Sequence, residues 1–233
     1  MSITHTENMS TAGSHKPGAL DSRVSLLPQG NHLLSLMTIL RESNTNVATF
    51  AEVTERIGDQ LISAALDLLP SKATTVVSPT GAEYQGIQET AEVCGVSILR
   101  AGASLENALR RGYTGPLSFG KLLIQRDETT SLPTLYYSKF PAGFASKTVF
   151  ILEPMLATGG SACAAIDAIK EAGVAEENII FVNILAAQHG ISVLFDRFPS
   201  LRLVTAAIDE ELTPSNHISP GLGDFGDRFY GTH

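Results

Sequence analysis

The sequence predicts an α/β fold in which helices flank a parallel sheet. Residues 149–152 are an apolar run without polar alternation, a pattern typical of a strand that is covered on both faces. Further strands are expected at residues 179–185 and 201–208. Helical patterns with short links separate these strands, and such a series predicts parallel strands joined by right-handed crossovers. Ligands of these sheets bind beyond the carboxyl ends of the strands, so we expect a site at that edge.

Residues 1–22 differ in composition from the rest of the chain. They are rich in Ser, Thr, His, Gly and Asn and have little apolar content, so they cannot bury enough surface to offset the entropy of ordering. We expect a disordered N-terminal tail there. Residues 23–233 should form a single domain, because a segment of this length can bury a substantial core.

Two amphipathic helices are expected before the sheet. Asn31 is expected to cap the first, which ends near Ser43 and Asn44, and the second covers residues 49–69 and is stopped by Pro70. Apolar residues recur on one face of each helix, which predicts packing against the sheet or a subunit interface. A short strand and turn should follow between residues 74 and 86.

The middle of the chain supplies further strands and an arm. We expect strands at residues 94–99 and 117–125, with a short helix between them. Residues 134–140 alternate between polar and apolar side chains, so residues 122–140 are predicted to form a β-hairpin arm. The glycine-rich C-terminal segment, residues 218–231, is too irregular for a regular element and is expected to be a hood loop.

Composition argues against several classes of function. The net charge of −8 and the pI near 5.2 disfavour nucleic-acid binding, because a phosphate backbone requires a basic surface. No apolar stretch approaches the length of a membrane span, so we expect a cytoplasmic protein that does not bind membranes. Cys94 and Cys163 lie in apolar segments without metal-binding spacing, which indicates buried reduced thiols and no metal site.

The segment after the strand at residues 149–152 has the outline of a phosphate site. Glu153 ends the strand, and residues 158–161 open a helix that Ser161 can cap and Gly173 can end. Backbone amides and the positive end of the helix dipole point at such a turn, and its glycines let an anion approach closely. A phosphomonoester fits best, although ordinary strand-to-helix turns also contain short motifs of this kind.

Several polar segments fall at the carboxyl ends of the predicted strands. They are Arg100, Arg126, Glu153 and residues 157–161. Arginine suits an anionic ligand because its fixed fork of N–H groups matches phosphate oxygens. The alternative for the two arginines is a surface salt bridge to an acid such as Glu106 or Asp127.

Four short motifs occur in one order along the chain. They are Ile-Leu-Arg-Ala-Gly at 98–102, Leu-Ile-Gln-Arg-Asp-Glu-Thr at 123–129, Glu-Pro-Met-Leu-Ala-Thr-Gly-Gly-Ser at 153–161 and Pro-Gly-Leu-Gly-Asp-Phe-Gly-Asp-Arg at 220–228. As an ordered set they closely resemble the uracil phosphoribosyltransferase family of type I phosphoribosyltransferases, in its eukaryotic or protozoan form. The likeness covers the chain from about residue 24 to the C-terminus.

The resemblance implies a reaction and the residues that bind its first substrate. Members of the family transfer ribose 5-phosphate from phosphoribosyl diphosphate to N1 of uracil, giving UMP and diphosphate, with Mg²⁺ carried mainly on the substrate diphosphate. By position, the phosphoribosyl diphosphate site would comprise Arg100, Arg126, Glu153, Pro154, Met155, Leu156, Ala157, Thr158, Gly159, Gly160, Ser161 and Asp224.

The same resemblance places uracil against the C-terminal segment. Ile218, Gly223, Asp224 and Phe225 would bind uracil, and Asp224 would also be the catalytic residue. Fixed main-chain groups matched to uracil reject cytosine, which presents the opposite hydrogen-bonding polarity at two positions. We expect Asp227 rather than Asp224 to stabilise the loop through an Asx turn. The family also implies GTP binding in some members and assembly as a homodimer or homotetramer.

The sequence departs from the family pattern at two places, which leaves alternatives open. Glu153 stands where the family usually has Asp, and residues 103–106 read Ala-Ser-Leu-Glu where it often has Glu-Ser-Met-Glu. The alternatives are a diverged, weakly active paralogue that binds ligands or regulates, and a phosphoribosyltransferase for another base. A dinucleotide-binding Rossmann protein is disfavoured, because the G-x-G-x-x-G turn is absent after the first strand.

Overall fold

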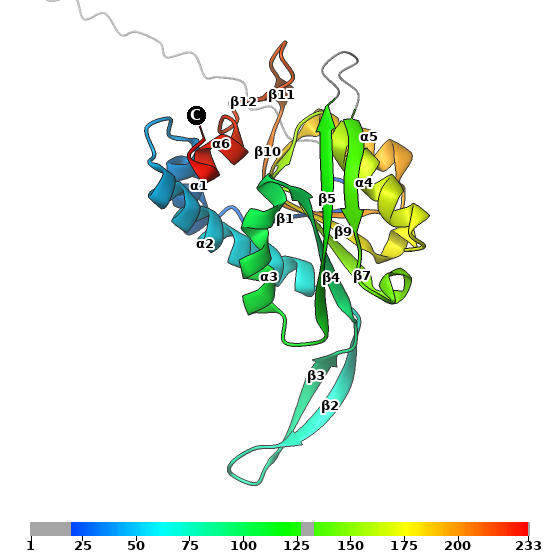
Figure 1. Ribbon diagram of the computed structural model, residues 1–233. Coiled ribbons are helices and arrows are strands. Elements are labelled where there is room, and N and C mark those ends of the chain that lie inside the picture. Colours follow the sequence, from blue (N-terminus) through cyan, green and yellow to red (C-terminus); the bar gives the residue numbers. More distant parts are fainter. Residues whose placement is uncertain (1–19, 127–132, 233) are drawn as a thin grey trace, which may run out of the picture.

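The computed structural model of the protein describes residues 20–126 and 133–232 (Figure 1). Within these residues an eight-stranded sheet forms the centre of the molecule. Its strands lie in the order β1 (Val24–Leu26), β10 (Arg202–Asp209), β9 (Ile179–Ala187), β7 (Thr148–Leu152), β4 (Val93–Leu99), β5 (Leu117–Arg126) and β6 (Pro133–Lys139), and the short β8 (Met155–Leu156) pairs with β9. All pairs are parallel except β5 with β6, which confirms the predicted α/β fold.

Helices cover both faces of the sheet, so its central strands are buried on two sides. One face is covered by α1 (Asn31–Arg41), α2 (Val47–Leu66) and α3 (Glu106–Gly112), and the other by α4 (Gly160–Glu171) and α5 (Gln188–Arg197) (Figure 1). Along β9, Ile180 and Val182 belong to the first core, whereas Ile179 and Phe181 belong to the second. This double burial is why residues 149–152 of β7 are a continuous apolar run in the sequence and β9 is apolar except for Asn183.

The ends of the helices follow local capping chemistry. α2 begins after Asn46, whose side chain accepts a hydrogen bond from the Thr49 amide at 2.9 Å. α4 begins after Gly159, which has a φ of 83°. The predicted cap at Ser161 is therefore wrong, because the left-handed glycine turns the chain into the helix two residues earlier. Gly173, with a φ of 97°, follows the end of α4 as predicted.

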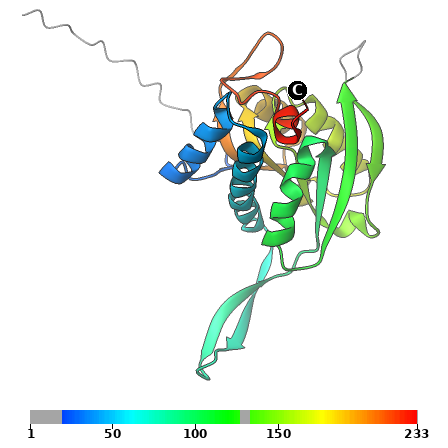
Figure 2. The same ribbon diagram turned by 60° about the vertical axis from the view of Figure 1, so that its left-hand side comes forward.

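Two hairpins differ in how they relate to the body of the protein. The predicted hairpin is present as β5 and β6, and it extends the edge of the central sheet. A second antiparallel hairpin, β2 (Ser71–Val77) with β3 (Glu83–Glu89), stands away from the body as an arm (Figure 2). The sequence predicts only a short strand and turn there. Most side chains of the arm are exposed on both faces, so it lacks the alternation that marks a half-buried strand.

The C-terminal segment is more regular than the sequence predicts. β12 (Ile218–Ser219) pairs with β11 (Glu211–Leu212), and α6 (Phe225–Tyr230) follows. The expectation of a loop without regular elements is therefore wrong. A helix of this length is not stable by itself in water and depends on tertiary contacts. Phe225 supplies one of them by packing against Phe50 of α2, with ring centroids 5.3 Å apart.

The N-terminus of α6 is capped by an aspartate. The Asp224 side chain accepts a hydrogen bond from the Asp227 amide at 2.9 Å, and Gly231 ends the helix with a φ of 68°. The expectation that Asp227 rather than Asp224 stabilises this segment is therefore wrong. Asp227 stands inside the helix, and its carboxylate accepts hydrogen bonds from Arg100 and Thr232.

Short elements complete the described part of the chain. The 3-10 helices are η1 (Ala101–Leu105), η2 (Phe144–Ser146) and η3 (Glu176–Asn178). Cys94 and Cys163 are buried free thiols, as predicted. No helix among the described residues combines the length and apolar character needed to cross a membrane. Of the expected N-terminal tail, residues 1–19 lie outside the described residues.

Candidate active site

Two adjoining cavities open at the carboxyl edge of the parallel strands. The turn chamber, of about 240 Å³, is lined by residues 98–101, 124, 153 and 155–162. The hood chamber, of about 390 Å³, is lined by residues 101, 153, 155, 157, 216–218, 220 and 223–226. Ala101, Glu153, Met155 and Ala157 line both cavities. A molecule that fills both chambers therefore passes over these four residues.

The turn chamber has the features of an anion site. Thr158, Gly159, Gly160 and Ser161 line it at the N-terminus of α4, a helix of 12 residues. Backbone amides lack intrahelical partners at such an end, and the helix dipole is positive there. The structure thus places the predicted phosphate turn in one cavity with Arg100.

Two glycines outside the predicted site allow neighbouring segments to pack directly against the backbone of the turn chamber. A Cβ atom on Gly102 of η1 would clash with the Leu152 carbonyl oxygen, and one on Gly190 of α5 would lie 2.5 Å from the Ala157 carbonyl oxygen. The sequence carries a signal for Gly190, since a glycine inside a helical pattern costs stability and usually marks close packing. α5 therefore packs directly against the main chain of the phosphate turn.

Arg100 lines the turn chamber, and the C-terminal segment contacts its guanidinium. Nη2 donates to Asp227 Oδ1 at 3.0 Å and Nη1 donates to Thr232 Oγ1 at 3.2 Å. The Arg100 side chain is 55% exposed and that of Asp227 38% exposed. An ion pair that water reaches so well contributes little to stability.

The alternative partners suggested for the two arginines are only partly described. Glu106 accepts a hydrogen bond from Lys121, so Glu106 is wrong as the partner of Arg100. The predicted kind of contact, an exposed salt bridge to an acid, is nevertheless present, with Asp227 as the acid. Arg126 ends β5 at the same edge of the sheet. Its side chain lies outside the described part of the structure, as does Asp127.

Glu153 lies where the two chambers meet and lines both. Burial raises the pKa of its carboxyl group to about 8, and the Met155 amide, 3.5 Å from Oε1, opposes this rise. The carboxyl group is therefore mostly protonated at pH 7 in the protein without ligands. In that form it donates as well as accepts hydrogen bonds and carries no charge that repels an anion.

The segment before the phosphate turn is fixed to β9. The Pro154 carbonyl oxygen accepts hydrogen bonds from the Ile184 and Leu185 amides at 2.9 and 3.0 Å, and the Glu153 amide donates to the Val182 carbonyl oxygen at 3.2 Å. Pro154 thus contacts the sheet rather than a chamber, whereas the other predicted residues of this run line the turn chamber.

The residues predicted to bind uracil all line the hood chamber. They are Ile218, Gly223, Asp224 and Phe225. One Asp224 oxygen caps α6, which fixes this carboxylate relative to the helix. Asn216 and His217 line the chamber as well. No local pattern in the sequence marks these two residues, because they belong to the turn between β11 and β12.

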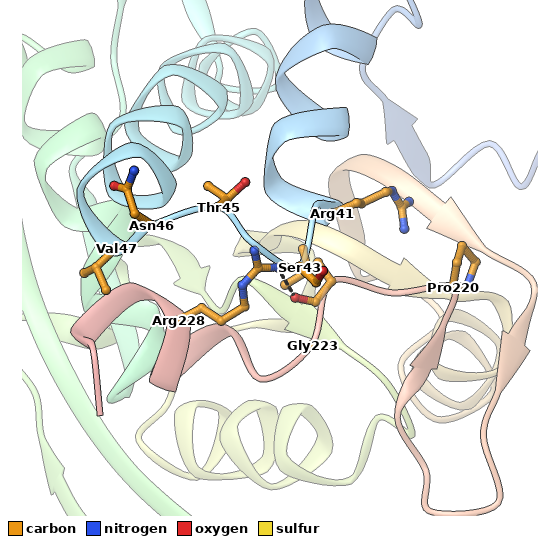
Figure 3. Close-up of a pocket in the computed structure, with 9 residues that line it drawn as sticks. Arg41, Ser43, Thr45, Asn46, Val47, Pro220, Gly223 and Arg228 are labelled. Atoms are coloured by element: carbon orange, nitrogen blue, oxygen red, sulfur yellow. Dashed lines mark hydrogen bonds between the residues drawn. The ribbon is translucent and has the colours of Figure 1, made fainter. Parts of the chain in front are cut away.

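Arg41 and Arg228 bind the C-terminal hood segment and line a third cavity of about 570 Å³ (Figure 3). Arg41 donates to both oxygens of Asp209 at 2.8 and 2.7 Å, and these residues also bind the main-chain oxygen and nitrogen of Gly221 at 2.8 and 2.9 Å. Arg228 donates to the Leu40 carbonyl oxygen at 2.6 Å. Since Arg41 and Leu40 end α1, this helix fixes the position of the hood. Sequence spacing gives no sign of these contacts.

A parallel sheet that carries an acid, a glycine turn at a helix N-terminus and a covering C-terminal hood at its carboxyl edge defines a type I phosphoribosyltransferase. Residues 27–232 match the model of the family described as uracil phosphoribosyltransferase. The chain belongs to the uracil phosphoribosyltransferase family, as the motif resemblance implies.

Named relatives and a solved structure agree with this assignment. The uracil phosphoribosyltransferase of Dictyostelium discoideum is 44% identical over 209 residues, which cover 90% of this chain and 96% of the relative. That of Saccharomyces cerevisiae is 44% identical over 207 residues, covering 89% and 95%. The AQ2163 protein from Aquifex aeolicus superposes with a TM-score of 0.79 at 28% identity, covering 90% of this chain and 98% of its own.

Replacing Gly190 with Ala should displace the phosphate turn without unfolding the protein. The added Cβ would press on the Ala157 carbonyl oxygen, whereas alanine is otherwise the better helix former by about 1 kcal/mol. We expect the affinity for ribose 5-phosphate, measured by calorimetry, to fall roughly tenfold or more. Gly30→Ala is the control, since a Cβ there meets nothing within 4 Å. Wild-type affinity in Gly190→Ala would contradict the role of the turn.

Glu153 should make stability fall as pH rises. Because its pKa is raised from 4.5 to about 8 on folding, the folded state binds the proton more tightly, and stability is lost progressively between these two values. Glu153→Gln cannot ionise, so its free energy of unfolding in urea should rise relative to that of the wild type across this range, by on the order of 5 kcal/mol at pH 8.5. The exposed substitution Glu210→Gln is the control, and a difference that is constant with pH would refute this account.

Proposed function

We infer that this protein transfers ribose 5-phosphate from phosphoribosyl diphosphate to N1 of uracil, forming UMP and diphosphate in pyrimidine salvage. The observation that carries this inference is that four residues line both chambers, so the two cavities adjoin. It lets a sugar phosphate in the turn chamber meet a base in the hood chamber. Membership of the family supports uracil as that base.

The turn chamber would hold phosphoribosyl diphosphate. The amides and hydroxyls of residues 158–161 would bind the 5-phosphate, and Glu153 would bind the ribose hydroxyls. Arg100, together with Arg126 at the end of β5, would bind the diphosphate through paired N–H groups. Most of the rate would then come from holding the anomeric carbon near the base and from neutralising the leaving group.

Uracil would occupy the hood chamber. Main-chain groups of Ile218, Gly223 and Phe225 would match its oxygen and N3–H pattern, so that cytosine would leave buried polar groups unpaired. Asp224 lines the same chamber. A carboxylate in this place can accept the N1 proton as the bond to the ribose forms.

We propose that Mg²⁺ reaches the site on the diphosphate. No group of three His, Cys, Asp or Glu side chains in residues 20–126 and 133–232 could hold a metal ion. Mg²⁺ commonly keeps several waters and binds substrate phosphates with one or two carboxylates. Glu153 and Asp224 are the carboxyl groups of the two chambers that could contact its water shell. When bound, the ion would neutralise charge on the leaving diphosphate.

The direct test combines the protein with uracil, phosphoribosyl diphosphate and Mg²⁺ and follows UMP. We expect UMP with uracil. The kcat/KM for cytosine should be lower than that for uracil by a factor of roughly 10³ or more. Omitting Mg²⁺ is the control for the role of the ion. Product with hypoxanthine or orotate but not with uracil would overturn the assignment.

The departure at Glu153 favours one competing function, a weakly active paralogue. Its side chain is one methylene longer than the usual Asp, which shifts the carboxyl group by about 1 Å and can spoil a ribose contact. We expect Glu153→Asp to change kcat/KM for phosphoribosyl diphosphate by less than tenfold. A much larger gain would mark the natural chain as impaired.

We propose that the protein forms a homodimer or homotetramer through the β2–β3 arm. A two-stranded hairpin alone is marginally stable in water, yet this arm exposes Val76, Val77, Tyr84 and Ile87. A second subunit that buries these side chains would stabilise the hairpin and explain its composition.

Placing a charge on the arm should therefore lower the oligomeric state. We expect Ile87→Asp, at a side chain that is 75% exposed, to shift the mass from light scattering after gel filtration towards a monomer. Leu20→Asp changes an exposed leucine outside the arm and should leave the mass unchanged. An unchanged mass for Ile87→Asp would exclude the arm as the interface.

A further inference from the structure

Three residues at the C-terminus, termed the clasp, contact Arg100 on two sides. They are Asp227, Tyr230 and Thr232. Besides the two guanidinium contacts described above, Thr232 Oγ1 donates to Asp227 Oδ1 at 2.7 Å. The Tyr230 hydroxyl donates to the Arg100 carbonyl oxygen at 3.0 Å, and the guanidinium carbon lies 5.5 Å from the centre of its ring. The clasp thus holds both the main chain and the side chain of this arginine.

The element that carries the clasp also reaches the hood chamber. Asp224 and Phe225, at the start of α6, line that chamber. The Asp227 amide donates to Asp224 Oδ1 at 2.9 Å, and Asp227 Oδ1 accepts from Arg100 at 3.0 Å. Two hydrogen bonds, one to the main chain and one to the side chain of Asp227, therefore connect Asp224 of the hood chamber to Arg100 of the turn chamber.

Stability alone does not account for the clasp. Its ion pair is well exposed, and such pairs are worth about 0–1 kcal/mol. Holding the guanidinium in one orientation does matter for a ligand, because a free arginine side chain loses rotamer entropy when it binds. A guanidinium has five N–H donors, so Arg100 can keep its two clasp contacts and still bind an anion.

We propose that Asp227, with Tyr230 and Thr232, is a positioning group that presents Arg100 to the diphosphate and couples this contact to the filling of the hood chamber. This inference rests on the proposed function. A base in the hood chamber adds contacts to the start of α6 and restricts it further, and the helix in turn restricts Arg100 further. Because coupling between sites is reciprocal, diphosphate tightens the binding of the base by the same factor.

The coupling can be measured with ligands that differ only in the base. Diphosphate with Mg²⁺ is titrated into the full-length protein saturated with UMP, and separately into protein saturated with ribose 5-phosphate. The ratio of the two Kd values isolates the effect of the base. We expect diphosphate to bind the wild type at least roughly fivefold more tightly with UMP, and this ratio to fall to within twofold of one in Asp227→Asn.

Asp167→Asn is a matched control. Asp167 pairs with Arg197 at 2.6 Å, with exposed fractions of 35% and 55% that nearly equal those of the clasp pair. It joins α4 to α5, outside the lining of either chamber, so this substitution should leave the ratio unchanged. If Asp227→Asn does not fold, Thr232→Val removes the second contact and is judged by the same ratio.

Two results would overturn the proposal. One is a ratio of Kd values near one in the wild type. The other is an Asp227→Asn variant that weakens diphosphate binding equally in the presence of UMP and of ribose 5-phosphate, which is the result expected of a purely structural role. Formation of UMP by the wild type in the same preparation separates these results from failure of the proposed function. Without UMP formation both inferences fall.

Discussion

Direct contact between main chains brings the parts of this active site together. The loop after β4 and the turn after β7 approach so closely that a methyl group on Gly102 would clash with the Leu152 carbonyl oxygen. α5 approaches the same turn through Gly190. Parallel strands place these loops at one edge, but the glycines remove the side chains that would hold them apart. As a result Arg100 and Glu153 share one cavity.

The two halves of the site have separate supports. The turn chamber depends on α4 and α5, whose apolar side chains belong to one core, whereas the hood depends on α1 and α2 in the other core. Arg41 and Asp209 fix the hood by polar contacts, and Phe225 anchors it against Phe50. Separate supports allow each chamber to be shaped for its own substrate, and the clasp on Arg100 connects them.

An acidic protein must hold a strongly anionic substrate, and local donors resolve this conflict. The net charge of −8 repels anions at long range, but the helix N-terminus and the arginines act over a few ångströms, where screening by salt is weak. Glu153 adds no repulsion while it is protonated, because burial raises its pKa to about 8. A partly buried, neutral acid in the chamber therefore suits an anion better than an exposed ionised acid would.

The sequence by itself determined the parallel sheet, the phosphate turn and the ordered motifs, because burial on two faces and a glycine turn before a helix leave local patterns. Most residues that it predicted to bind substrates line one of the two chambers. Only the tertiary structure decided the helix α6, the free arm, the cap at Asp224 and the partners of Arg100. α6 is too short to be stable alone, and Arg100 meets Asp227 across 127 residues. Contacts of this range depend on where the sheet brings distant loops together, which no local pattern records.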